Sequence, residues 1–397
     1  MNGQGFTYML QGLDRSLLEE PVPGGTGIED EETEEDSLSA HITEPFDPSL
    51  IRVNTKPLTI DLLLERLRQD ELDLSPGFQR KAGIWKDAAQ SRLIESILIR
   101  IPLPAFYMDA TRDERWLVVD GLQRLTALKR FAVTQELRLE GLDFLTQFHG
   151  QTYGDLPRSF QRRILETQVT LYLIEEGTPA TVKFNIFKRI NTGGLPLSAQ
   201  EIRHALNQGA ATEILARLAS SEEFKTATSR SIRDDRMGDR ECILRFLAFC
   251  LTPYHNYQSE DFDGFLNAAM STLNGLPESA LEELDRRFKR AMKAAHGIFG
   301  DRAFRKRKPG TSYRYPISKA LFEAWSVGLD HLSDEELGGI ESRRDVVDER
   351  FVNLNQDRAF LEAISFGTGS VAKVRTRFSA IANLLSGVVR DSTASHS

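Results

Sequence analysis

The chain has 397 residues, and 40% of them carry apolar side chains, which is typical of globular proteins with sizeable buried cores. Residues 1–50 hold twelve acidic and one basic side chain, a net of −11, whereas the remainder holds 46 acidic and 49 basic, a net of +3. No run approaches the roughly 18–20 apolar residues of a membrane span, and no basic-then-apolar signal peptide begins the chain. These features exclude an integral membrane protein and predict a cytoplasmic one.

The cysteine and histidine content excludes two further classes. Cys242 and Cys250 stand eight residues apart in a helical pattern, about 12 Å along the axis, which is too far for a disulfide. The seven His and two Cys show no paired spacing typical of zinc ligands, and no metal site is predicted.

Residues 1–50 are predicted to be a disordered leader. A Pro/Gly-rich stretch, residues 21–27, precedes the acidic run 29–36, which has nothing to bury. The leader is interpreted as a solubilising tail, with competition against nucleic acid for a basic surface as the alternative.

Residues 51–195 mix two periodicities. Apolar residues at helical spacing occur in 58–67 and 93–101, and short β-type runs occur at 105–108, 116–119 and 169–174. Residues 196–397 give mainly helical patterns, at 198–207, 210–219, 238–250, 260–272, 278–299, 316–328 and 356–386. We therefore predict an α+β protein: a small α+β domain over 51–195, followed by an α-helical domain over 196–397.

One segment of the first domain suggests an anion site. A β run ends at Asp120, Gly121 permits a tight turn, and Leu122, Leu125 and Leu128 begin a helix with one apolar face. Such a junction offers unpaired backbone N–H groups and the positive end of the helix dipole to an anion.

Polar side chains of this junction fit the same role. Arg124 adds a fork of donors suited to phosphate, and Asp120 could accept from a ribose hydroxyl or hold a metal or water. The alternative is structural: Asp120 caps the helix and Arg124 pairs with a nearby carboxylate.

Two other segments carry candidate ligands. Gln79 and Arg80 lie in a Pro/Gly loop before Trp85, where they could contact a second phosphate or a base; a solvated arginine is the simpler interpretation. Further along, a polar turn lies between two helical patterns and is followed by Ser198 and Glu201 at capping-box spacing. The turn is either part of a site or only a helix–turn–helix corner, and its residues are Asn191, Thr192, Gly193 and Gly194.

Together these segments resemble a known family over roughly residues 55–250. The quoted motifs are Phe78-Gln79-Arg80 with Trp85, Leu93-Ile94-Glu95-Ser96-Ile97-Leu98 with Pro102-Leu103-Pro104, Asp120-Gly121-Leu122-Gln123-Arg124-Leu125-Thr126, and the run from Arg189 to Arg203. They resemble the ParB/sulfiredoxin-like domain at the N-terminus of GmrSD-type modification-dependent restriction enzymes, which is characterised by a D-G-Q-Q-R motif.

The resemblance implies binding of a nucleoside triphosphate (NTP), with Mg²⁺ as its companion, and NTP hydrolysis in the members of defence systems. It implies catalytic roles for Asp120, Gln123 and Arg124. It also implies nucleotide contacts from Gln79, Arg80, Gly121, Asn191, Thr192, Gly193, Gly194 and Arg203. The first Gln of the family motif is Leu122 here, which puts hydrolysis in doubt more than binding.

The resemblance also bears on partners. Some relatives carry a C-terminal HNH nuclease with a His-x-x-Pro signature, and this sequence has no such signature. The expected partners are therefore an NTP, DNA, and a separate nuclease or effector protein.

A second hypothesis is a non-catalytic nucleic-acid-binding module. Six basic residues and three aromatic residues share the segment 302–315, and such mixtures suit phosphates and unpaired bases. The candidate contacts are Arg305, Lys306, Arg307, Lys308 and Arg314. Alternatively, this basic segment is solvated or pairs with acidic groups, including those of the leader.

Overall fold

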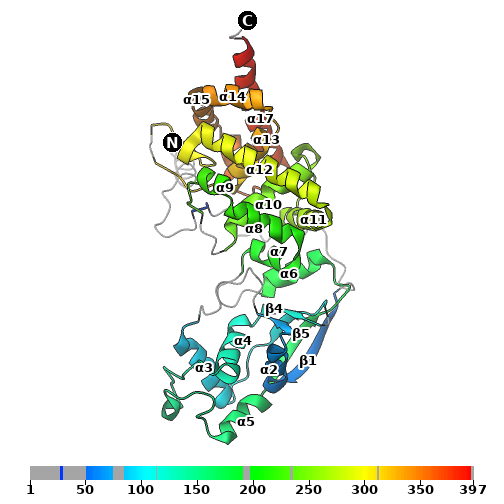
Figure 1. The fold of residues 1–397 in the computed structure, drawn as a ribbon, viewed down its shortest axis with the longest axis vertical. Helices are drawn as coiled ribbons and strands as arrows, with labels where there is room; N and C mark the ends of the chain where they lie inside the picture. Colours follow the sequence, from blue (N-terminus) through cyan, green and yellow to red (C-terminus); the bar gives the residue numbers. More distant parts are fainter. Residues whose placement is uncertain are drawn as a thin grey trace, which may run out of the picture. The chain divides into compact units, whose positions relative to one another are not determined.

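A computed structural model describes residues 27–29, 51–74, 85–112, 114–190, 197–232, 236–310 and 313–394. The chain divides into two compact units, with the boundary between Leu206 and Asn207 (Figure 1). The first unit contains a five-stranded sheet, and the second is helical, so the predicted α+β class is confirmed. The boundary lies later than residue 195, where the sequence analysis placed it.

The first unit, which we call the α+β unit, is built on a mixed sheet of order β1-β5-β3-β4-β2. β1 runs antiparallel to β5, β5 parallel to β3, β3 antiparallel to β4, and β4 parallel to β2. The strands are β1 (Val53–Thr59), β2 (Leu72–Asp73), β3 (Phe106–Asp109), β4 (Trp116–Asp120) and β5 (Gln168–Ile174).

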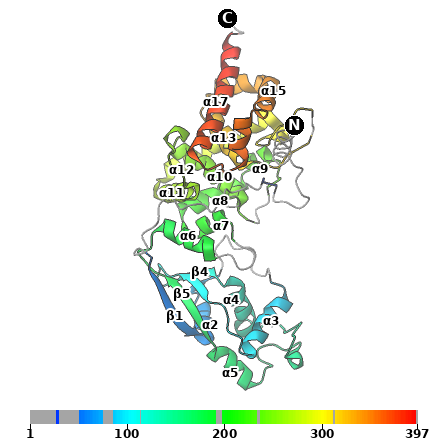
Figure 2. The same cartoon turned by 180° about the vertical axis from the view of Figure 1, so that it is seen from behind.

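Helices cover both faces of this sheet. They are α2 (Ile60–Arg68), α3 (Asp87–Leu98), α4 (Leu122–Leu128) with the π-helical turn η3 (Lys129–Val133), the 3-10 turn η4 (Thr146–Phe148), α5 (Arg158–Glu166), α6 (Ala180–Ile190) and α7 (Ala199–Leu206). Because successive strand residues point to opposite faces, Phe106 and Met108 join the core formed with α2, α3, α4 and α5. Figure 2 shows these four helices beside the sheet. Val119 and Ile174 instead pack with Phe184, Phe187 and Ile202 from α6 and α7.

The second unit, the helical unit, contains twelve helical segments among the residues described. They are α8 (Ala210–Ser220), α9 (Glu222–Ala227), α10 (Gly238–Leu251), η5 (Tyr254–Asn256), α11 (Phe262–Gly275), α12 (Glu278–Phe299), η6 (Gly300–Arg302), α13 (Lys319–Asp330), α14 (Asp334–Ser342), α15 (Arg344–Leu354), α16 (Arg358–Ser365) and α17 (Val371–Ala394). The single helix predicted over 356–386 is two helices, α16 and α17, because the chain is extended at Phe366 and turns at Gly367. Cys242 and Cys250 are free thiols.

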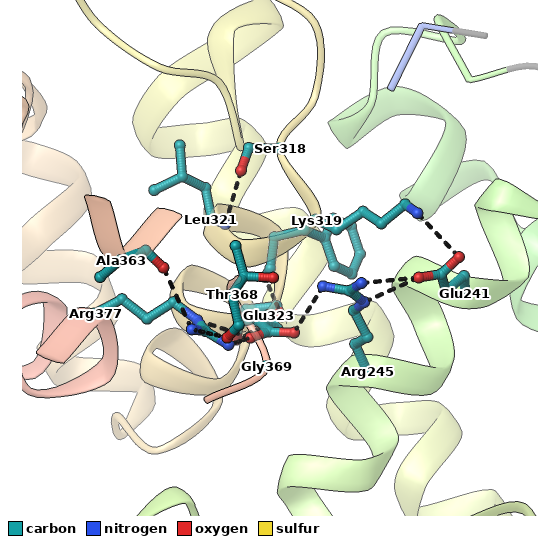
Figure 3. A network of polar contacts seen from close by, with 12 residues as sticks. Glu241, Arg245, Ser318, Lys319, Leu321, Glu323, Ala363, Thr368, Gly369 and Arg377 are labelled. Atoms are coloured by element: carbon teal, nitrogen blue, oxygen red, sulfur yellow. Dashed lines mark hydrogen bonds and ion pairs between the residues drawn. The ribbon is translucent and has the colours of Figure 1, made fainter. Parts of the chain in front are cut away.

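A network of buried charges joins three of these helices (Figure 3). Glu323 of α13 is fully buried and accepts from Nε of Arg377, on α17, at 2.8 Å. Arg245 of α10 lies 3.6 Å from the same carboxylate and 2.8 Å from Glu241. Lys319 reaches the other oxygen of Glu241 at 3.0 Å. Paired in this way, the charges tie α10, α13 and α17 together at the centre of the unit.

The leader is only partly as predicted. Ile28 is buried in the core of the helical unit, which contradicts the prediction of a disordered leader at this position. The rest of the leader lies outside the described residues. No helix in the described ranges is both long and apolar enough to cross a bilayer.

Candidate functional site

The candidate site is the junction between β4 and α4, which sequence analysis selected. Gly121 adopts a left-handed conformation with φ of +102° and forms the N-cap of α4. A Cβ atom at this position would lie 2.3 Å from Cδ1 of Phe106. Glycine is required here both for its backbone angles and for the close approach of the ring.

Arg124 is committed to protein groups at this junction. It is buried and donates to the carbonyl of Pro104, to the carbonyl of Ala105 at 3.1 Å, and to Oδ2 of Asp120 at 2.7 Å. Its guanidinium also lies over the ring of Phe106, 4.4 Å from the centroid. Burial lowers the pKa of Arg124, and the charge of Asp120 partly opposes that shift.

The structure thus decides one alternative left open by the sequence. Arg124 pairs with a nearby carboxylate, as in the structural interpretation, and its fork is not open to an anion in this structure. The N-cap of α4 is Gly121, and no side-chain cap hydrogen bond is present among the described residues, so Asp120 does not cap the helix.

Asp120 itself remains accessible. Its side chain is 31% exposed, and Arg124 holds only Oδ2. No residue that the structure describes donates to Oδ1 of Asp120. The junction therefore presents a fixed carboxylate oxygen with unused acceptor capacity.

Two tyrosines beside Asp120 were missed by the sequence analysis. Tyr107 pairs with Asp120 across the β3–β4 ladder and with Tyr172 across the β3–β5 ladder. The two tyrosine rings stack with centroids 4.8 Å apart. Burial raises the pKa of Tyr107, with smaller contributions from Tyr172 and Asp120. The alternation of Tyr107 with the core residues Phe106 and Met108 was the available signal, because it places Tyr107 on the opposite face.

The first described residue after Gln79 and Arg80 contacts this junction. Both residues lie outside the described ranges, but the next described residue, Trp85, donates its backbone N–H to Oε1 of Gln123 at 3.3 Å. Gln123 therefore holds the backbone of Trp85. Its expected catalytic role remains a prediction.

The first described residue after the second polar segment packs against a cluster that includes a residue of β4. Asn191, Thr192, Gly193 and Gly194 lie outside the described ranges. Leu197, which follows them, packs against the cluster that contains Val119, the neighbour of Asp120. The predicted capping box is confirmed: Ser198 N–H donates to Glu201 at 2.5 Å, and Glu201 N–H donates to Ser198 Oγ at 3.1 Å.

Arg203 is buried between α6 and α7. It donates to Oε1 of Gln200 at 3.2 Å, and its guanidinium lies 5.6 Å from the ring centroid of Phe184. These contacts place Arg203 in the α6–α7 corner. Its predicted contact with a nucleotide remains a prediction.

The structure corrects the expected exposure of the basic segment. Arg305, Lys306 and Arg307 are buried in the helical unit. Arg305 donates to Ser231 Oγ at 2.7 Å, Lys306 bonds Glu29, and Arg307 lies 3.1 Å from Asp348. Pairing with acidic groups, including the leader, was the alternative interpretation, and it is confirmed for Lys306 and Arg307. Arg305 is instead held by backbone carbonyls and by the hydroxyl of Ser231.

Two members of the segment are exposed. Lys308 faces solvent, and Arg314 is exposed with Asp301 at 3.6 Å. Contact between nucleic acid and these two residues remains a prediction.

Together, these observations define a small α+β domain with a polar site at a strand–glycine–helix junction. Residues 61–207 match the family described as "GmrSD restriction endonuclease, N-terminal domain", so this segment of the chain is similar to that domain. The family resemblance inferred from the motifs is thereby confirmed. Comparison with curated proteins and with solved structures gave no match.

Proposed function

We propose that the α+β unit binds an NTP at the β4–α4 junction and that the chain acts in a restriction-like, DNA-linked defence system. The main support is convergence. Gln123 accepts a hydrogen bond from Trp85, the first described residue after the segment with Gln79 and Arg80. Leu197, the first described residue after the segment 191–194, packs against the cluster that contains Val119. Trp85 and Leu197 are therefore tied to side chains near Asp120 in the sequence.

In this proposal, Asp120 is the residue that meets the ligand. Its free oxygen is available to a ribose hydroxyl or to the Mg²⁺ that accompanies the phosphates, since Mg²⁺ is often bound by one or two carboxylates together with substrate phosphates. Bound Mg²⁺ would neutralise charge on the phosphate oxygens. The stacked Tyr107 and Tyr172 offer an aromatic surface beside the carboxylate.

Arg124 takes a different role from the one first expected. Because its donors hold Asp120 and two carbonyl groups, we assign it as a positioning residue that fixes the carboxylate rather than as a phosphate ligand. Phosphate contacts fall to Gln79, Arg80, Asn191, Thr192, Gly193, Gly194 and Arg203. We also propose that the bound NTP is hydrolysed. Leu122 replaces the first Gln of the family motif and would slow this hydrolysis.

The alternative, a non-catalytic nucleic-acid-binding module, loses much of its support. Three of the five basic side chains on which it rests are buried and bonded to protein groups. DNA and a separate nuclease remain the proposed partners of the nucleotide-binding protein.

The test is a thermal-shift titration of the full chain with each NTP and Mg²⁺, combined with measurement of phosphate release. A ligand that binds only the folded state raises Tm by mass action. We expect one NTP to raise the Tm of the wild type, and Asp120→Asn and Arg124→Ala to lose that shift. Asp70→Asn, at an exposed carboxylate of the same unit, is the control and should keep it.

The proposal fails if no NTP shifts the wild type, or if folded Asp120→Asn responds as the wild type does. Phosphate release without any stabilisation by NTP would also contradict it.

A further inference from the structure

Residues Gly27–Glu29 lie on the helical unit, where Ile28 forms a parallel β-bridge with Ile317. The N–H of Glu29 donates to the carbonyl of Ile317 at 2.8 Å, and the N–H of Ile317 donates to the carbonyl of Gly27 at 3.0 Å. On its other side, Ile317 forms an antiparallel bridge with Arg305. Ile317 is thus bridged on both sides, to Ile28 of the leader and to Arg305.

The first position of this tripeptide fits only glycine. Gly27 has φ of +80°, and a Cβ atom there would lie 1.8 Å from the carbonyl oxygen of Ser231. Ser231 is itself held in place, because Arg305 donates to its Oγ at 2.7 Å. No side chain can be accommodated without moving the backbone.

The second position takes an aliphatic side chain. Ile28 is buried in the hydrophobic core of the unit. Beneath it lies Gly238, the first residue of α10, where a Cβ atom would come within 2.6 Å of Cδ1 of Ile28. The absence of a side chain at residue 238 therefore makes the space that Ile28 fills.

The third position takes a carboxylate. Lys306 is 3% exposed, and its ammonium bonds both Glu29 and Oγ of Ser365, the latter at 2.7 Å. A buried ammonium left without an anion is strongly destabilising. The site therefore favours an acidic residue after the aliphatic one.

We propose that Ser231, Gly238, Lys306 and Ile317 form a peptide-binding slot for an extended Gly–aliphatic–acidic tripeptide. We name it the acceptor slot, and its ligand in this chain is its own Gly27-Ile28-Glu29. Main-chain bonds to Ile317 give affinity, and the three side-chain positions give selectivity, as in other cases of strand addition. The slot acts as a latch that attaches the acidic leader to the helical unit, and it is independent of the proposed nucleotide site.

The test asks whether the slot binds the tripeptide from solution once its own ligand is removed. The probe is a fluorescent peptide of residues 22–34, titrated by anisotropy into the full chain. In the wild type the attached segment competes at a high effective concentration. We expect Ile28→Asp, which empties the slot, to bind the probe at least about tenfold more tightly than the wild type.

Two controls separate the slot from non-specific charge attraction. The double variant Ile28→Asp with Gly238→Ala, in which the added methyl group fills the slot, should lose binding. Leu62→Asp, the same kind of change at an exposed position of the α+β unit, should bind no better than the wild type. The proposal is overturned if folded Ile28→Asp does not bind the probe, or if the double variant binds it equally well.

Hydrogen exchange on a milder variant decides the matter if Ile28→Asp does not fold. Gly238→Ala adds one methyl group at a helical position, and alanine favours the helix over glycine. We expect exchange in α10 to be unchanged or slower, and exchange of the Ile317 N–H to be at least about fivefold faster, because loss of the bridge to Ile28 makes local opening easier. Unchanged exchange at Ile317 would overturn the proposal.

Discussion

Nη2 of Arg124 lies 2.7 Å from Oδ2 of Asp120, and Gly121, the N-cap of α4, lies between the two residues in the sequence. The pair is largely sheltered on the arginine side and partly open on the aspartate side. This asymmetry explains why the junction offers a fixed carboxylate and not a free guanidinium. Substitution of Arg124 should therefore change the stability of the unit as well as ligand binding.

Arg124→Lys should destabilise the α+β unit by about 2 kcal/mol. Lysine keeps the charge but cannot span two carbonyl groups and a carboxylate with a planar fork. Urea unfolding measures the change, and Arg162→Lys, at an exposed residue of α5, is the matched control. Equal stability of the two variants would show that the bonds of Arg124 do not contribute to the fold.

Gly121→Ala should cost more stability than Gly150→Ala. Both glycines have positive φ, of +102° and +79°, but only Gly121 has a ring within contact distance of its missing Cβ. Backbone strain alone costs about 1–2 kcal/mol, and the clash with Phe106 adds to it at residue 121. The measurement is the difference in unfolding free energy, and similar values for the two variants would contradict the close approach.

The stability of the α+β unit should depend on Glu95 at acidic pH. Its buried carboxylate accepts from the backbone N–H groups of Asp143, Phe144 and Leu145, at 3.0, 2.7 and 2.6 Å. Burial raises the pKa of Glu95, but these three bonds outweigh it, so its pKa lies below the ordinary 4.5. Stabilisation from a carboxyl with a lowered pKa is present above the unfolded value and is lost as the pH falls through the folded value.

Glu95→Gln should therefore destabilise the protein at pH 7, and its difference from the wild type should shrink as the pH is lowered below about 4.5. Unfolding free energies between pH 7 and pH 3 test this, with Glu166→Gln, an exposed carboxyl, as control. A difference that stays constant over that range would show that ionised Glu95 is not the stabilising form.

Arg377→Met should destabilise the helical unit by about 3–5 kcal/mol, because it removes one partner of a buried ion pair. Glu323 would lose the partner that holds it at 2.8 Å, and the carbonyl of Thr368 would lose a donor at 2.6 Å. Arg375→Met, at an exposed position of the same helix, should cost little. Thermal unfolding of the two variants provides the comparison, and comparable Tm values would contradict a stabilising role for the network.

The helices and strands predicted correctly are those whose apolar residues recur at a single period, helical or β-type. The helical period over 278–299 is sustained, and α12 spans Glu278–Phe299. β3, β4 and β5 lie on the predicted β runs within two residues. β1 was missed because Val53–Thr59 is a largely exposed edge strand containing Pro57, so it lacks apolar alternation. Short helices such as α9, of six residues, leave too few apolar positions to define a period.

The site was only partly predictable. The sequence around Gly121 pointed to a strand–glycine–helix junction, but the burial of Arg124 depends on the carbonyls of Pro104 and Ala105, which lie about twenty residues away. Burial of the basic segment likewise depends on distant partners such as Glu29 and Asp348. A run of basic residues predicts charge but not the direction of each side chain, and here Phe304, at φ of +61°, departs from regular backbone just before Arg305.

The most direct test of the nucleotide site is hydrogen exchange of the full chain with and without the NTP that gives the largest thermal shift, in the presence of Mg²⁺. The account predicts that the nucleotide slows amide exchange at Gly121–Gln123 and at Trp85, and that Asp120→Asn removes this protection. A nucleotide that stabilises the protein while exchange at these amides stays unchanged would place its binding site elsewhere and contradict the account.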